Sequence, residues 1–131
     1  KACPLTTSPN NNQHYAEPNT YAAWHKNTKT RVNSSSGGVF SALAENIIIA
    51  GGVVFGAAYT TDFKSVEHIA IETKEEISLI RGSKYVQSST RKAFPLVKQF
   101  LTKGKKVLFV GTPCQIAGLK SKYLPAEPVA L

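Results

Sequence analysis

Residues 105–119, KKVLFVGTPCQIAGL, decide the fold of this chain, because a strand-like run passes directly into a helix-like one within them. Val107 to Val110 is typical of a buried strand, and Gly111 frees the backbone to turn. Thr112 can cap a helix, and Pro113 is tolerated in a first helical turn. The pattern therefore predicts a helix that carries Cys114 in its first turn.

Cys114 follows a predicted strand at a position where chemistry is expected. The unpaired N–H groups and the positive dipole end of a helix favour a thiolate over a thiol. In open α/β sheets, ligands also gather at the carboxyl ends of strands. A metal ligand or a nucleophile is therefore expected here, although the same spacing also fits a small buried cysteine after a tight turn.

The rest of the chain alternates between helical and extended patterns. A helix is predicted after the loop SSSGG at 34–38, because apolar pairs recur every four residues as far as Ile48, and Gly51 and Gly52 end it. The other predicted elements are a short strand over 20–24, a hairpin of strands over 53–59 and 66–71, a short helix over 74–81, a brief strand over 85–87 and a helix over 90–102. This alternation predicts an α/β fold with a layered, mixed and mostly parallel sheet and flanking helices.

The charge of the chain points to an anionic partner. Sixteen Lys and Arg residues against eight Asp and Glu residues give a net charge of +8. These basic residues are spread along the chain and form no nucleic-acid-binding motif, so a phosphate-bearing cofactor or an acidic redox partner is expected rather than nucleic acid.

The composition also bounds the size and setting of the protein. The 131 residues, 42% of them hydrophobic, suit one domain. The longest apolar run, 47–59, has 13 residues, fewer than the about 18 that a membrane span needs. Two distant cysteines without a secretory signal favour a reducing, cytoplasmic setting. Because the chain has no methionine and stops soon after a predicted helix, we expect an incomplete fragment of a larger protein.

Two more segments have the composition of ligand-binding loops. The loop 34–38 places three hydroxyls and two glycines at a helix N-terminus, where backbone N–H groups and the dipole can hold a phosphate. It matches neither a Walker loop nor the G-x-G-x-x-G pattern, and in a simpler interpretation one serine only caps the helix. In the loop GSKYVQS at 82–88, Lys84 can face a phosphate and Tyr85 can pack on a ring.

Four segments, taken together and in order, closely resemble the beta subunit family of the deazaflavin (coenzyme F-420) hydrogenases and dehydrogenases. They are SSSGGVFS (34–41), GGVVFGA (51–57), RGSKYVQS (81–88) and GTPCQIAGL (111–119), within a resemblance that covers about 21–124. Members of that family are iron-sulfur flavoproteins, in which FAD carries the hydride chemistry and 4Fe-4S clusters deliver electrons singly. The resemblance therefore implies an oxidoreductase.

The resemblance also implies roles for single residues. Cys114 would be an iron-sulfur ligand, Cys3 looks like the last cysteine of a ferredoxin motif, and Lys84 is expected near the flavin pyrophosphate. The residues expected to bind the cofactor are Ser35, Ser36, Gly37, Gly38, Gly82, Ser83, Lys84, Tyr85, Gln87, Ser88 and Thr112. By this resemblance, 1–19 is a linker with the tail of a truncated ferredoxin-like region, 20–124 is the N-terminal flavoprotein domain, and 125–131 starts a truncated C-terminal region.

The implied function is to move electrons between iron-sulfur clusters and a flavin, and on to a hydride acceptor such as a deazaflavin coenzyme or another small molecule. A redox partner protein or hydrogenase-type subunits are the expected partners. The excerpt alone is expected to be inactive, because a 4Fe-4S cluster normally takes four ligands. Two alternatives stay open: an enzyme that uses Cys114 as its nucleophile, and a non-catalytic module that binds a partner in a redox complex. A nucleophile needs a base, and His68, which alternates with Glu67 along a predicted strand, is expected at the surface or satisfied in the core.

Overall fold

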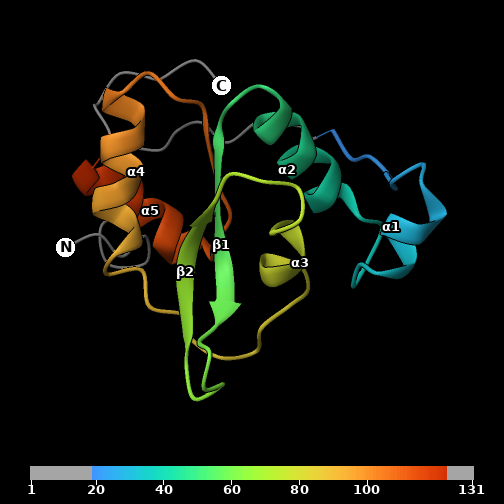
Figure 1. The fold of residues 1–131 in the computed structure, drawn as a ribbon, viewed down its shortest axis with the longest axis horizontal. Coiled ribbons are helices and arrows are strands. Elements are labelled where there is room, and N and C mark those ends of the chain that lie inside the picture. The colour runs from blue at the N-terminus through green and yellow to red at the C-terminus, as the bar shows by residue number, and fades with distance from the viewer. Residues whose placement is uncertain (1–18, 124–131) are drawn as a thin grey trace.

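A three-stranded sheet forms the centre of the computed structural model, which describes residues 19–123 (Figure 1). Strand β1 (Val53–Tyr59) lies in the middle, with β2 (Val66–Ile71) antiparallel on one side and β3 (Val107–Phe109) parallel on the other. The predicted α/β class and the predicted mixed sheet are therefore confirmed. The described sheet has one antiparallel and one parallel pairing, so a mostly parallel sheet stays a prediction.

Helices cover both faces of this sheet. Figure 1 shows α4 and α5 on one side of the strands and α2 and α3 on the other, with α1 beyond α2. The helices span Thr28–Val32 (α1), Val39–Ile49 (α2), Ile77–Ile80 (α3), Ala93–Thr102 (α4) and Pro113–Tyr123 (α5). None of the helices in the described part of the chain is long and apolar enough to cross a membrane.

Strand β1 separates two hydrophobic cores. Val54 and Ala58 pack with Ala44 of α2 and Ile77 of α3, whereas Phe55, on the opposite face, packs with α4 and α5. Successive strand residues point to opposite faces, and a strand that is covered on both faces has a nearly continuous apolar sequence. The sequence VVFGAAY of β1 therefore reflects burial from two sides.

Several sequence predictions agree with these elements. The helix after the loop 34–38, the hairpin of β1 and β2, the helix that ends at Thr102 and the helix that carries Cys114 are all confirmed. The predicted helix over 74–81 is present only as the four residues of α3. Strand β3 is half-buried rather than buried, because it lies at an edge of the described sheet.

Two predicted strands are wrong. Residues 20–24 are not a strand: the chain there packs on the loop 34–38, and the N–H of His25 donates to the carbonyl oxygen of Gly37 at 2.6 Å. Residues 85–87 are not a strand either, and only the nearby Ser89 forms an isolated bridge, to Glu67 of β2. Both segments have exposed side chains, so the burial that stabilises a strand is missing.

Gly56 controls how closely α3 approaches the sheet. A Cβ atom at this position would lie 3.0 Å from both Cβ and Cδ1 of Ile80, a side chain of α3 that is 6% exposed. Carbon atoms pack best at about 3.5–4.0 Å, so any side chain at position 56 displaces Ile80. Gly56 thus allows α3 to pack closely on the sheet. The position of α3 in turn sets where the segment 81–88 begins.

We expect Gly56→Ala to lower the free energy of unfolding by about 1–3 kcal/mol, the usual cost of overpacking. Ile80→Val removes the Cδ1 atom that the new methyl group meets, so the double variant should lose less than the sum of the two single variants. Urea unfolding of all four proteins measures this coupling. Additive losses would contradict the contact.

Candidate functional site

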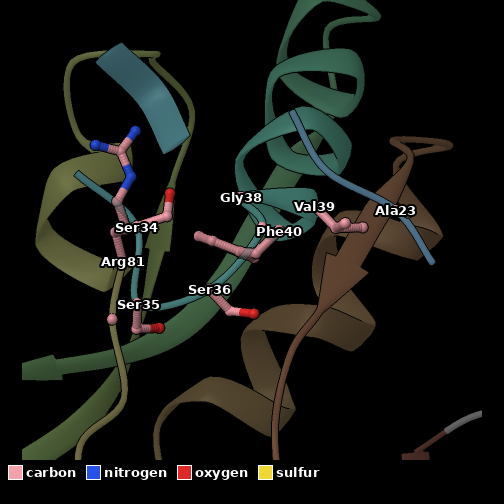
Figure 2. Close-up of a pocket in the computed structure, with 10 residues that line it drawn as sticks. Ala23, Ser34, Ser35, Ser36, Gly38, Val39, Phe40 and Arg81 are labelled. Atoms are coloured by element: carbon pink, nitrogen blue, oxygen red, sulfur yellow. The ribbon is translucent and has the colours of Figure 1, made fainter. Parts of the chain in front are cut away.

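Two of the segments that the sequence singled out line one pocket. Its volume is about 190 Å³, and it lies between the loop 34–38 and the chain that leaves α3 (Figure 2). The lining residues are Ala23, Ser34, Ser35, Ser36, Gly37, Gly38, Val39, Phe40, Arg81 and Gly82. Segments more than forty residues apart in the sequence therefore meet at the start of α2.

The N-terminus of α2 has no side-chain cap. Its cap residue is Gly38, with φ 79°, and no side-chain cap hydrogen bond is made. The Ser34 side chain does not cap α2 either, since its hydroxyl donates to the carbonyl oxygen of Thr30 at 2.7 Å. The simpler interpretation, in which a serine caps this helix, is therefore wrong. The first N–H groups of α2 remain available to an anion, beside the exposed Ser35 and Ser36.

Arg81 supplies the positive charge of the pocket. Its Nε donates to Oγ of Ser41 at 3.1 Å, and Ser41 is fully buried in α2. In Figure 2 the Arg81 side chain extends past Ser34 and away from the hydroxyl groups of Ser35 and Ser36. The sequence prediction missed Arg81, although it directly precedes Gly82 in the segment RGSKYVQS.

Gly37 keeps the loop against the segment before α1. A Cβ atom at position 37 would lie 2.6 Å from the carbonyl oxygen of Ala23, which is closer than such atoms can approach. The backbone hydrogen bond from His25 to Gly37 holds the same contact. The glycine is thus required by close packing of two backbone segments, and this packing shapes the pocket wall.

The rest of the segment 82–88 lies outside the pocket. Lys84 Nζ donates to the carbonyl oxygens of Arg81, at 2.8 Å, and of Leu79, at 3.3 Å, and burial lowers the pKa of this amine. Lys84 therefore binds the end of α3 rather than the pocket. Tyr85 is 96% exposed, and Ser83 and Gln87 are exposed too.

A second group of predicted residues meets at the start of α5. The N–H of Thr112 donates to Oε1 of Gln115 at 2.9 Å, and Nε2 of Gln115 donates to Oγ of Ser88 at 3.0 Å and to its carbonyl oxygen at 3.2 Å. The first contact is one half of a capping box. Because Gln115 makes both contacts, the cap of α5 is tied to the segment 82–88.

Cys114 is exposed in the first turn of α5, so the prediction of a small buried cysteine is wrong. Its Sγ lies 3.1 Å from Oγ1 of Thr112, and no other hydrogen-bond partner of the thiol occurs within residues 19–123. A threonine hydroxyl is not a base, so nothing in this geometry favours the nucleophile alternative.

The described residues contain no group of three or more His, Cys, Asp or Glu side chains that could hold a metal ion. Cys3, the second proposed iron ligand, lies outside these residues. Cys114 is therefore a single candidate ligand in the part of the chain that the structure places.

His68 of β2 supports the turn that leads to Cys114. The ring is 5% exposed and stacks on Phe109 with 4.9 Å between centroids and 5° between planes, and its Nε2 donates to the carbonyl oxygen of Val110 at 2.9 Å. Its Nδ1 is buried without a partner among residues 19–123, so the expectation of a satisfied histidine is only half correct. Burial lowers the pKa of His68.

A comparison with protein families identifies the chain as part of an oxidoreductase subunit. The family described as coenzyme F-420 hydrogenase/dehydrogenase, beta subunit N-term, matches residues 20–94, more than half of the chain. The chain belongs to this family, and the predicted resemblance is confirmed. The matched range includes every residue of the pocket and ends before Cys114. No curated protein matches the chain.

The buried imidazole predicts an acid-sensitive fold. The unfolded chain, with His68 at its ordinary pKa of 6.5, binds the proton more readily than the folded protein, so His68 contributes full stability above pH 6.5 and less as the pH falls. We expect the melting temperature to drop between pH 7.5 and 5.5, and to drop less in His68→Gln. His25→Gln is the matched control. An unchanged pH dependence in His68→Gln would contradict this role.

Proposed function

We propose that this chain is the flavin-binding part of a redox protein that moves electrons between iron-sulfur clusters and FAD. The electrons would pass on to a hydride acceptor such as a deazaflavin coenzyme or another small molecule. Membership of an F-420 hydrogenase/dehydrogenase subunit family supports the oxidoreductase class. Hydrogenase-type partner subunits and a cytoplasmic setting are parts of the same proposal.

The observation that carries the proposal is the uncapped start of α2, which opens into a pocket beside Arg81. Free N–H groups, the helix dipole and a guanidinium all favour an anion. Ligand sites usually measure about 300–1,000 Å³, and this pocket, at about 190 Å³, is smaller. It therefore fits a phosphate-bearing part of FAD rather than the whole dinucleotide.

FAD, when bound, supplies the exchange between single electrons and hydride. The residues of this chain would bind and orient it. The N–H groups of α2 and the hydroxyls of Ser35 and Ser36 would hold phosphate oxygens, while Arg81, fixed by Ser41, would neutralise their charge. Lys84 would act indirectly, because its contacts with Leu79 and Arg81 hold the turn from which Arg81 extends.

The iron-sulfur part of the proposal needs more ligands than the cysteines of this chain supply. A 4Fe-4S cluster normally takes four ligands, and the whole chain contains two cysteines. The described residues therefore do not form a cluster site by themselves. Cys114 is proposed as one of the four ligands, because it is exposed at a helix N-terminus.

The flavin proposal predicts that Arg81→Met weakens FAD binding by about tenfold or more, since a hydrogen bond to a charged group contributes roughly 1.5–3 kcal/mol. Flavin fluorescence quenching measures the affinity. Arg91→Met is the matched control, because Arg91 is exposed just before α4 and outside the pocket. Equal affinities of the two variants would contradict the role of the pocket, provided that both melt like the parent.

The cluster proposal predicts that Cys114→Ser lowers the iron and sulfide bound after anaerobic reconstitution of the protein with its partner subunits. The exposed thiol can be replaced without a packing cost, so the melting temperature should not change. Undiminished iron in the variant would show that Cys114 is not a ligand.

A further inference from the structure

Acidic and basic residues are separated along the chain. Residues 77–123 include ten Lys and Arg residues and no Asp or Glu. Both α4 and α5 lie in this range, and they pack together over one face of the sheet (Figure 1). Their outer surface therefore carries positive charge and has no acidic residue of its own.

A shallow groove crosses this surface. Its volume is about 420 Å³, and its lining residues are Pro95, Lys98, Gln99, Thr102, Lys103 and Tyr123. Tyr123 packs on Phe94 with 5.6 Å between ring centroids, and Lys122 Nζ lies 5.7 Å from the centre of the Tyr123 ring. An aromatic side chain thus lies beside three lysines. We call this group of four residues the α4–α5 face; it consists of Lys98, Lys103, Lys122 and Tyr123.

The three lysines of the α4–α5 face are not neutralised within residues 19–123. Two other basic residues of the range have acidic partners: Lys92 lies 3.7 Å from Glu67, and Lys105 pairs with Glu72. No acidic side chain of the described residues pairs with Lys98, Lys103 or Lys122. Their charge is therefore available to a partner of opposite sign.

We propose that the α4–α5 face docks an electron-carrier protein with an acidic surface. An aromatic centre with a charged rim is typical of protein interfaces, and complementary charge speeds and orients docking. Nucleic acid bound along a strand would stack on successive aromatic residues, whereas this groove offers one. The family is one of subunits, which favours a protein partner.

The α4–α5 face and Cys114 are at opposite ends of α5. A helix of 11 residues spans about 16 Å, so docking at Tyr123 leaves the thiol free for another contact. The redox character of the partner rests on the proposed function, whereas the docking rests on the charge and shape of the face.

The test measures binding of a small ferredoxin with negative net charge, by biolayer interferometry, to the full chain at rising NaCl concentration. We expect affinity to fall steeply with salt, and the triple variant Lys98→Glu, Lys103→Glu and Lys122→Glu to bind about tenfold more weakly or worse. The triple variant Lys26→Glu, Lys29→Glu and Lys64→Glu is the matched control, because it makes the same change in net charge on exposed residues outside this face.

Three outcomes would overturn the proposal. They are salt-independent or absent ferredoxin binding, an equal loss in both triple variants, and tighter binding of a DNA duplex that the first triple variant abolishes. Melting curves show whether each variant is folded. FAD affinity, measured on the same proteins, should not change in either triple variant, so a failure of docking is distinguishable from a failure of the flavin site.

Discussion

The contact between Gly56 and Ile80 determines where the pocket forms. With no side chain at position 56, α3 lies directly on the central strand, and the chain leaves α3 at Arg81, within reach of the buried Ser41 of α2. Arg81 thereby faces the loop at 34–38. The absence of a side chain at Gly56 of β1 thus brings the charge of Arg81 to the uncapped N-terminus of α2. This site lies at the edge of the hydrophobic core that α2, α3 and β1 share.

The other core supports the turn that carries Cys114. Two long-range hydrogen bonds hold this turn: His68 of β2 donates to the carbonyl oxygen of Val110, and Gln115 donates to Ser88. Neither interaction is local in sequence. The exposed thiol of Cys114 therefore lies on a turn that hydrogen bonds fix from both sides.

Most of the fold could be predicted from the sequence, because the spacing of apolar residues along a helix or strand indicates which of its faces is buried. The helix from Val39 and the strand from Val53 both follow from spacing alone. Edge strands and contacts between distant segments do not follow from spacing. This explains the wrong strands at 20–24 and 85–87, and it explains why the sequence did not decide between a surface and a core position for His68. In the pocket, composition identified the loop at 34–38 but not Arg81, whose position depends on how α3 packs. Lys84 was the opposite case: its charge was expected near the flavin pyrophosphate, and its amine is found in contact with the end of α3.

The measurement that tests the central claim most directly compares the affinities of the protein for FAD and for riboflavin, by fluorescence titration. The two ligands share the ring system, and only FAD carries phosphates. If the N-terminus of α2 and Arg81 hold a phosphate-bearing part of the flavin, FAD should bind at least about tenfold more tightly, a difference of about 1.4 kcal/mol. Equal affinities would show that the pocket does not hold the phosphates and would contradict the account.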